Sequence, residues 1–308
     1  MQISSLITAL PGAVAQGLIW GIMAIGVYLT FRVLDIADLT VDGTMCTGGA
    51  VCIMMMLSGY NVWISMLAAT AVGMLAGLAT GIFHTFMGIP AILAGILTQL
   101  SLYSVNLKIM GKANQAINVD KYNLLVSLRN IKNVPVSKNT ILIVAVICVI
   151  LIAILYWFFG TELGCSLRAT GCNPNMSRAQ GINTDLSKVL GLMLSNGLVA
   201  LSSALLAQYQ GFSDVNMGRG AIVIGLAAVI IGEAIFGRIF NNFALRLLSV
   251  VFGSILYYLV LQVVIWMGID TDLLKMLSAL VVAFFLAFPY WKGKYFTKPL
   301  KRGGNDHA

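Results

Sequence analysis

Long apolar runs recur along the whole chain and constrain its fold more than any other feature. They are almost free of charge and are separated by short polar segments. About 20 apolar residues is the length that an α-helix needs to cross the hydrocarbon core of a bilayer. Hydrophobic residues make up 59% of the 308 residues and charged residues only 10%, whereas a water-soluble domain carries about 25% charged residues. The sequence therefore predicts an integral membrane protein.

Window hydrophobicity divides the chain into apolar segments with boundaries good to a few residues. They lie at about 13–31, 43–57, 62–83, 89–110, 140–160, 189–209, 220–237, 243–267 and 273–290. Several are short or rich in glycine, and irregular backbone at membrane depth is tolerated where protein or a hydrated cavity surrounds it. We therefore expect an all-α, polytopic membrane helix bundle of roughly eight to ten segments, some of them broken or re-entrant.

The formal net charge of +8 does not indicate nucleic-acid binding, because its Lys and Arg residues gather in short loops and in the tail at 291–308. Basic clusters beside membrane spans determine topology and contact anionic lipid. The five cysteines match neither a zinc spacing nor a disulfide framework, and His84 has no metal partner at helical spacing. We expect membrane lipid as a partner, and no nucleic acid, metal or cofactor.

Two basic polar stretches, 111–139 and 161–188, flank a single apolar span at about 141–159, so they must lie on opposite sides of the membrane. Because both are basic, the positive-inside rule does not choose between them. Counting spans back from the Lys-rich tail, taken as cytoplasmic, places 161–188 inside and 111–139 outside. The expected organisation is a transmembrane domain at 1–290, with an external loop and a cytoplasmic loop, and a basic cytoplasmic tail at 291–308.

Carboxylates interrupt the chain between the first two apolar segments. Asp35, Asp38 and Asp42 occupy one short stretch that returns to apolar sequence through Gly43. A charge at the bilayer centre costs at least about 2.5–3.5 kcal/mol on insertion scales. The stretch therefore lies at the membrane surface or lines a hydrated cavity. The glycine favours the cavity, because it permits an unwound backbone.

A second polar break, Gln208–Gly220, contains Ser213, Asp214 and Asn216 and precedes the apolar run at 221–231. Polar side chains and glycines before a helix start can present free backbone N–H groups to a carboxylate-bearing solute. An external turn capped by Asp214 or Asn216 is an equally good interpretation.

Glycine positions bear on how the helices are arranged. The helices that precede the two polar breaks begin near Gly17 and Gly197. They suggest a weak internal repeat of the kind that builds midplane pathways in transporters, although apolar helices also resemble one another by chance. Gly73, Gly77 and Gly81 recur every four residues in one segment, a spacing that predicts close packing of two helices.

Glu233 lies among apolar residues. It requires a partner such as Arg238, a hydrated wall, or a pKa raised far enough to keep it neutral. We expect a structural ion pair or hydrogen bond near the cytoplasmic boundary.

A short polar segment leads into the apolar run at 189–209. Asn173 suits a helix N-cap, Pro174 suits the first helical turn, and Gly181 suits the stop. These residues predict a short helix along the cytoplasmic face, where it can carry force from a motor to the spans.

At this segment the chain resembles the permease subunits of ABC importers of the branched-chain amino acid and ribose type. The resemblance consists of the threonine–x–x–glycine start at Thr161, the pair Arg168-Ala169, a short variable helix, and Gly181-Ile-Asn before a span rich in small residues. Cys165 departs from the pattern, because the family often has arginine there.

Two further stretches, Leu39–Gly43 and Gly211–Glu233, look most like one branch of that family, sometimes linked to aromatic amino acid uptake. The resemblance covers most of the chain. It implies a permease subunit that moves a small polar solute, such as an amino acid, across the cytoplasmic membrane of a prokaryote.

The resemblance also implies partners. A second, identical permease subunit would complete the pathway, an ATP-binding subunit would dock on the cytoplasmic loop, and a solute-binding protein would deliver cargo from outside. The sequence has no G-x-x-x-x-G-K-[ST] phosphate loop, so we expect ATP hydrolysis on a separate chain and no enzyme activity in this one. The residues expected to line the pathway are Asp38, Thr40, Asp42, Gln99, Asn106, Ser213, Asp214 and Asn216, and those expected to couple to the ATPase are Arg168, Ala169, Gly171, Asn173, Pro174, Arg178 and Gly181.

The sequence leaves two other classes of protein as alternatives to a permease subunit. A membrane-embedded enzyme needs convergent His, Asp, Glu or Cys side chains, and the only concentration of these is at Asp35–Asp42. A secondary transporter or a channel needs no partner ATPase, and activity in vesicles without ATP would favour it.

Overall fold

The computed structural model describes residues 3–119, 121–122, 124–131, 139–237, 239–240 and 242–268, and isolated residues between 273 and 287. The predicted tail at 291–308 and most of the apolar segment predicted at 273–290 lie outside the described residues. The helices are α1 (Ile3–Tyr28), α2 (Thr40–Leu57), α3 (Val62–Thr85), α4 (Ala91–Met110), α5 (Thr140–Phe158), α6 (Glu162–Cys172), α7 (Pro174–Ala179), α8 (Thr184–Gln210), α9 (Ala221–Phe236) and α10 (Phe243–Trp266). The π-helical turn η1 (Leu29–Val33) extends α1, the 3-10 turn η2 (Leu128–Ile131) precedes α5, and two short strands are β1 (Asn114–Ala116) and β2 (Phe212–Asp214).

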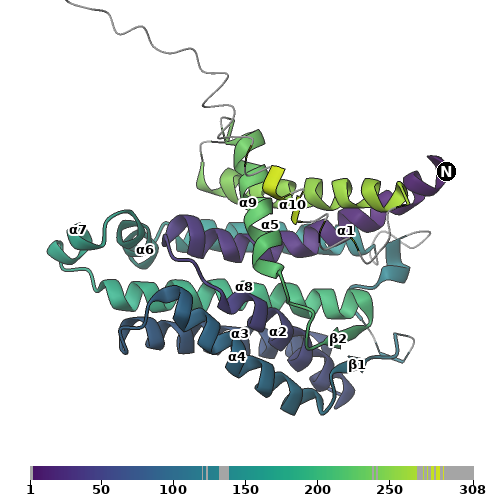
Figure 1. Ribbon diagram of the computed structural model, residues 1–308, viewed down its shortest axis with the longest axis horizontal. Helices are drawn as coiled ribbons and strands as arrows, with labels where there is room; N and C mark the ends of the chain where they lie inside the picture. Colours follow the sequence, from purple (N-terminus) through teal and green to yellow (C-terminus); the bar gives the residue numbers. More distant parts are fainter. Residues whose placement is uncertain are drawn as a thin grey trace, which may run out of the picture.

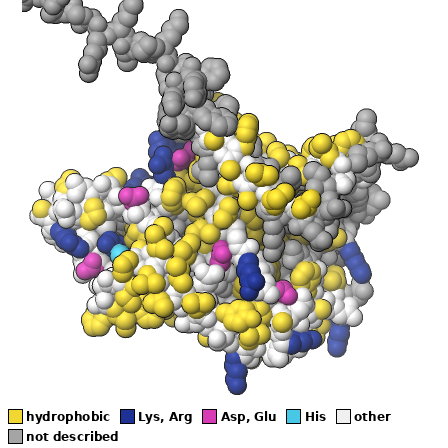
Figure 2. All heavy atoms as spheres, viewed as in Figure 1, with side chains coloured by type: hydrophobic (Ala, Val, Ile, Leu, Met, Phe, Trp, Pro, Cys, Tyr) yellow, Lys and Arg dark blue, Asp and Glu magenta, His cyan; other side chains and the backbone are white. Residues whose placement is uncertain are grey.

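The predicted polytopic helix bundle is confirmed. Within the described residues, seven helices are long and apolar enough to cross a membrane. Several of them run along the long axis of the molecule (Figure 1), and hydrophobic side chains cover much of the face seen in Figure 2. The eighth apolar helix, α9, has only 16 residues, which is shorter than the roughly 20 that a full crossing requires.

The polar stretches lie at opposite ends of the bundle, as expected for segments separated by the single span α5. Helices α6 and α7 form one end, and strands β1 and β2 form the other (Figure 1). The strands pair antiparallel, with Asn114 opposite Asp214 and Ala116 opposite Phe212. The loop after α4 and the loop after α8 are therefore joined at one end by backbone hydrogen bonds.

Close packing of α3 on α8 confirms the prediction from the four-residue glycine spacing. A β-carbon at Gly73 would collide with Ala200 on α8, and one at Gly77 would collide with the carbonyl oxygen of Leu192. Glycine plays the same role where α1 meets α10, since a β-carbon at Gly17 would lie 2.7 Å from the Cα of Ile255. Such contacts bring backbones together without the bulk of side chains.

Two helices begin inside the bundle. The extended segment after η1 leads inward to Thr40, where α2 begins, and Asp38 in this segment is only 2% exposed. Asp38 is hydrogen-bonded to Asn196, near the middle of α8, so a location at the membrane surface is wrong for it. The start of α9 is likewise internal, because its first residues contact Asp42 of α2.

The two broken segments run in opposite directions. Helix α1 ends and α8 begins at the α6–α7 end, since Gly171 of α6 contacts the Val33 carbonyl and α8 follows α7 directly. Helix α2 then points from its internal start toward the strands, and the shorter α9 points away from them. Opposed helix starts of this kind occur in transporters built from inverted repeats, and the internal repeat suggested by the sequence stays a prediction.

Candidate functional site

Asp42 closes the N-terminus of α9 from across the bundle. Its carboxylate oxygens accept hydrogen bonds from the backbone N–H of Gly220 and of Ile222, each at 3.0 Å. The first N–H groups of a helix lack partners within the helix and carry a partial positive charge. Asp42 therefore satisfies these donors, and the helix end stabilises its negative charge inside the protein.

Asp38 plays the same role for α2. One carboxylate oxygen accepts the backbone N–H of Thr40 at 2.9 Å, and the other accepts the Asn196 side-chain amide at 2.7 Å. The Asn196 carbonyl oxygen in turn accepts the Thr44 hydroxyl at 2.7 Å. A buried carboxylate is tolerated when hydrogen bonds replace its hydration, and here they also tie α2 to α8.

Threonine hydroxyls extend this network to two further helices. The Thr40 and Thr80 hydroxyls are 2.7 Å apart, and Thr80 donates to the Thr98 hydroxyl at 2.9 Å. The three residues belong to α2, α3 and α4 and are almost fully buried. The start of α2 is therefore linked by polar contacts to three surrounding helices.

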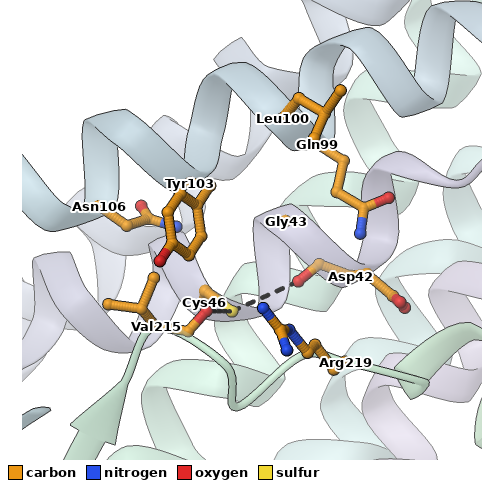
Figure 3. Close-up of a pocket in the computed structure, with 9 residues that line it drawn as sticks. All are labelled: Asp42, Gly43, Cys46, Gln99, Leu100, Tyr103, Asn106, Val215 and Arg219. Atoms are coloured by element: carbon orange, nitrogen blue, oxygen red, sulfur yellow. Dashed lines mark hydrogen bonds between the residues drawn. The ribbon is translucent and has the colours of Figure 1, made fainter. Parts of the chain in front are cut away.

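A cavity of about 260 Å³ lies beside this network, between α2, α4 and the loop before α9 (Figure 3). Its lining residues are Asp42, Gly43, Cys46, Gln99, Leu100, Tyr103, Asn106, Val215 and Arg219. Leu100 and Tyr103 are 64% and 44% exposed, so the cavity reaches the outer surface of the bundle along α4. Its lining combines one carboxylate, one guanidinium, two amides and an aromatic ring.

Asn106 is the most telling residue of this cavity. Its side chain is fully buried, and within the part of the chain that the structure describes neither amide atom has a hydrogen-bond partner. An unsatisfied buried amide costs roughly 1–3 kcal/mol. Figure 3 shows Gln99, Tyr103 and Asn106 on α4, across from the loop that carries Val215 and Arg219. Among the described residues that line the cavity, Asn106 is thus the one whose amide is buried without a partner.

The structure brings together three of the residues expected to line a pathway. Asp42, Gln99 and Asn106 line the cavity, while Asp38 and Thr40 belong to the buried network behind it.

The other three expected residues lie apart from the cavity lining. Asp214 accepts hydrogen bonds from the Asn114 side chain and from the backbone of Asn216, as the capped-turn interpretation expects. Asn216 is exposed at that turn. Ser213 is fully buried near Gly49 of α2.

Several residues of the site were not singled out from the sequence. Cys46 accepts a hydrogen bond from the backbone of Gly218 and lines the cavity, and Tyr103 and Arg219 line it as well. A usable signal existed for Asn196, because an amide inside an apolar span is rare and usually faces the protein interior. Nothing local distinguishes Cys46 or Tyr103 from ordinary packing residues.

At the opposite end, α7 is a capped helix exposed at the tip of the molecule (Figure 1). The Asn173 side chain accepts the Met176 N–H at 3.0 Å, Pro174 occupies the first turn, and Gly181 has a φ of +82°. These contacts confirm the short helix predicted from the sequence. Arg178 donates to the Thr184 hydroxyl at 2.8 Å, so it also fixes α7 to the start of α8.

Arg168 and Gly171 lie on α6, which packs against the end of α1. Gly171 allows α6 to contact the Val33 carbonyl. The Arg168 guanidinium stacks over Phe243 at 4.3 Å and over Phe159 at 5.4 Å, measured to the ring centroids. Arg168 therefore points toward the spans, whereas α7 points away from them. Ala169 is half-buried on the same helix.

Broken helices that meet around an internal polar cavity, together with an exposed helix between spans, define a membrane transport protein. A family model described as "Branched-chain amino acid transport system / permease component" matches residues 10–286. The chain belongs to this family.

Relatives and one solved structure extend the comparison. The tyrosine transport system permease protein of Clostridioides difficile is 38% identical over 273 residues, 88% of each chain. The autoinducer 2 import system permease protein LsrC of Yersinia pseudotuberculosis is 30% identical over 68% of this chain and 58% of its own. The structure of PsaBC from Streptococcus pneumoniae in complex with Fab matches with a TM-score of 0.53 at 18% identity, covering 95% of this chain and all of that one, and it supports the fold alone.

The family assigns the class of activity. The chain is the membrane-spanning permease subunit of an ATP-binding-cassette importer for small solutes, located in the bacterial cytoplasmic membrane. ATP is hydrolysed by a separate subunit, and a solute-binding protein supplies the solute. Family membership therefore favours a permease subunit over the two alternatives, a secondary transporter and a membrane-embedded enzyme.

Proposed function

We propose that the importer carries an α-amino acid with an aromatic side chain and that the cavity beside Asp42 is part of its pathway. Arg219 would pair with the amino acid carboxylate, and the amide oxygens of Gln99 and Asn106 would bind its ammonium group. Leu100 and Tyr103 offer apolar surface to its side chain. The buried, unpartnered amide of Asn106 carries this proposal. The name of the 38% identical relative, a tyrosine transport system permease, supports the substrate class.

The working unit is a homodimer with the pathway between its two copies. The cavity contains Asp42 and Arg219 and reaches the outer face of α4. A charged cavity cannot open onto lipid, because exposing charge to hydrocarbon is costly. A second copy that covers α4 would close the cavity on that side.

The end formed by α6 and α7 faces the cytoplasm, and the paired strands face the exterior. Helix α7, with Arg178, is the contact for the ATP-binding subunit. The expected residues Arg168, Ala169 and Gly171 lie on α6 and would pass the contact on to the spans against which α6 packs. The outward-facing apolar side chains of α5, such as Val149 and Ile150, contact membrane lipid.

The transport test uses vesicles that contain the permease, its ATP-binding subunit and its solute-binding protein. We expect ATP-dependent uptake of tyrosine that unlabelled phenylalanine reduces and fructose does not. Asn106→Leu should slow uptake at least about tenfold, because the loss of hydrogen bonds to a charged ligand is worth roughly 1.5–3 kcal/mol.

The matched control is Ser101→Ala, because Ser101 is exposed on the same helix and bonds only to the Leu97 carbonyl among the described contacts. Uptake should match that of the wild type. Equal rates in Asn106→Leu and Ser101→Ala, with solute still transported, would remove the cavity from the pathway.

A further inference from the structure

A second polar cavity, of about 470 Å³, lies at the α6–α7 end, away from the solute pathway. It forms where η1, α6 and α10 meet. Its lining residues are Tyr28, Arg32, Val33, Arg168, Cys172, Phe243 and Arg246. Three of these are arginines, which the sequence places on segments far apart in the chain and the fold brings to one place.

The positive charge of this cavity is only partly neutralised. Arg32 pairs with Glu233 at 2.9 Å. Among the described residues, no carboxylate lies within ion-pair distance of Arg168 or Arg246. The Arg168 Nε is buried and has no hydrogen-bond partner there. Arg246 interacts with the Tyr28 hydroxyl, which carries no charge to neutralise it, so the cavity keeps positive charge that an anion would offset.

Stacking on two aromatic rings fixes the Arg168 guanidinium at this cavity. Its guanidinium lies over Phe243 at 4.3 Å and over Phe159 at 5.4 Å. Cation–π contact of this kind fixes the plane of the guanidinium while leaving its N–H groups free to bind. Planar, oriented N–H donors match the oxygens of a phosphate group.

An adjoining cavity indicates where the rest of the ligand lies. It measures about 600 Å³, shares Arg168 and Phe243 with the first, and is also lined by Tyr156 and Trp157 at the end of α5. Trp157 is 72% exposed and Tyr156 is 49% exposed. Exposed Tyr and Trp at the end of a span mark the level of the lipid head groups.

We propose that the arginine cavity binds the phosphate of an anionic phospholipid from the cytoplasmic leaflet, with the glycerol region along Tyr156 and Trp157. Basic pockets between spans on the cytoplasmic side suit such head groups. The assignment of this end to the cytoplasm rests on the proposed function. A lipid fits these cavities better than an acidic segment of the ATP-binding subunit does, because both cavities lie against the ends of spans. The exposed surface proposed to contact the ATP-binding subunit is instead on α7.

The test measures lipid binding to the purified full-length permease, without ATPase or solute. Phosphatidylglycerol should raise the melting temperature and be retained in native mass spectra, and phosphatidylcholine should do neither. Arg246→Gln should weaken phosphatidylglycerol binding about fivefold, since one basic residue near a lipid surface is worth about a factor of that size. Glu233→Gln should strengthen it, because the competing carboxylate is lost.

Lys108→Gln is the matched control, since Lys108 is exposed near the opposite end of the bundle, and it should bind lipid as the wild type does. Arg246→Lys, which keeps the charge, should restore part of the affinity and guards against a folding defect. Unchanged phosphatidylglycerol binding in Arg246→Gln would overturn the proposal. Full stabilisation by inorganic phosphate alone would overturn the lipid as the source. Because this test measures no transport, its results can be interpreted even if the proposed transport function is wrong.

Discussion

Asp38 and Asp42 show how two carboxylates are held within a helical membrane protein by hydrogen bonds, with no ion pair to either among the described residues. Each lies at the N-terminus of a helix that begins inside the bundle, where it accepts hydrogen bonds from the first backbone N–H groups of that helix. Backbone donors and a helix end replace the water that the charges would otherwise require.

Removal of Asn196 should expose the dependence of Asp38 on its neighbour. Asn196→Leu deletes the 2.7 Å bond to Asp38 and the acceptor of Thr44, which should lower the free energy of unfolding by about 2–4 kcal/mol. The measurement is unfolding in detergent followed by circular dichroism.

The exchange Asp38→Asn with Asn196→Asp provides the control for that change. It preserves a donor on one side of the pair and an acceptor on the other, so it should recover most of the lost stability. Failure of this double variant to recover, alongside a severe single variant, would mean that the site depends on side-chain volume and not on hydrogen bonding.

The ion-pair partner of Glu233 could not be identified from the sequence. An ion pair was correctly expected, with Arg238 as the nearest candidate. The carboxylate instead pairs with Arg32, which is 201 residues away in the chain, and Arg238 lies outside the described residues. Helix packing determines which residues form ion pairs, and the residues next to Glu233 in the sequence carry no information about that packing.

At the scale of single elements, the sequence predicts what local composition determines. The spans follow from hydropathy, the α7 helix follows from Asn173, Pro174 and Gly181, and the α3–α8 contact follows from glycine spacing. The three-residue strands β1 and β2 were not predictable, because their pairing depends on two loops meeting about 100 residues apart. The internal start of α9 was likewise visible only as a short apolar run.

Replacement of α7 tests the element proposed to contact the motor. A Gly/Ser segment in place of Pro174–Gln180 removes the whole of α7 while leaving α6 packed on the end of α1, so the permease should stay folded. We expect the ATP-binding subunit to be lost on affinity purification, because an unstructured segment loses the pre-ordered surface.

The same replacement at residues 58–60, the exposed turn between α2 and α3, should leave co-purification intact. Full recovery of the ATP-binding subunit with the altered α7 would place the motor contact elsewhere.

At the scale of the whole molecule, we propose that the exposed apolar face of α4 contacts a second permease copy and that the exposed face of α5 contacts lipid. The exposed cysteines Cys165 and Cys172 are first replaced by serine, since the other three are buried. Leu100→Cys should then cross-link two copies in native membranes, because α4 is the proposed dimer face.

Val149→Cys is equally suited to reaction, since Val149 is 62% exposed on α5, but it should remain monomeric on denaturing gels because α5 faces lipid. Cross-linking through Val149→Cys and not through Leu100→Cys would reverse the assignment of the two faces.

The short strand pair joins the segment from Asn114 to Asp214 into a closed circuit that contains α5, α6, α7 and α8. Backbone bonds at one end of this circuit and the capped α7 at the other leave its long helices little freedom to slide separately. If α7 is the motor contact proposed above, its displacement would reach the strands through α5 and α8 together and not through one helix alone.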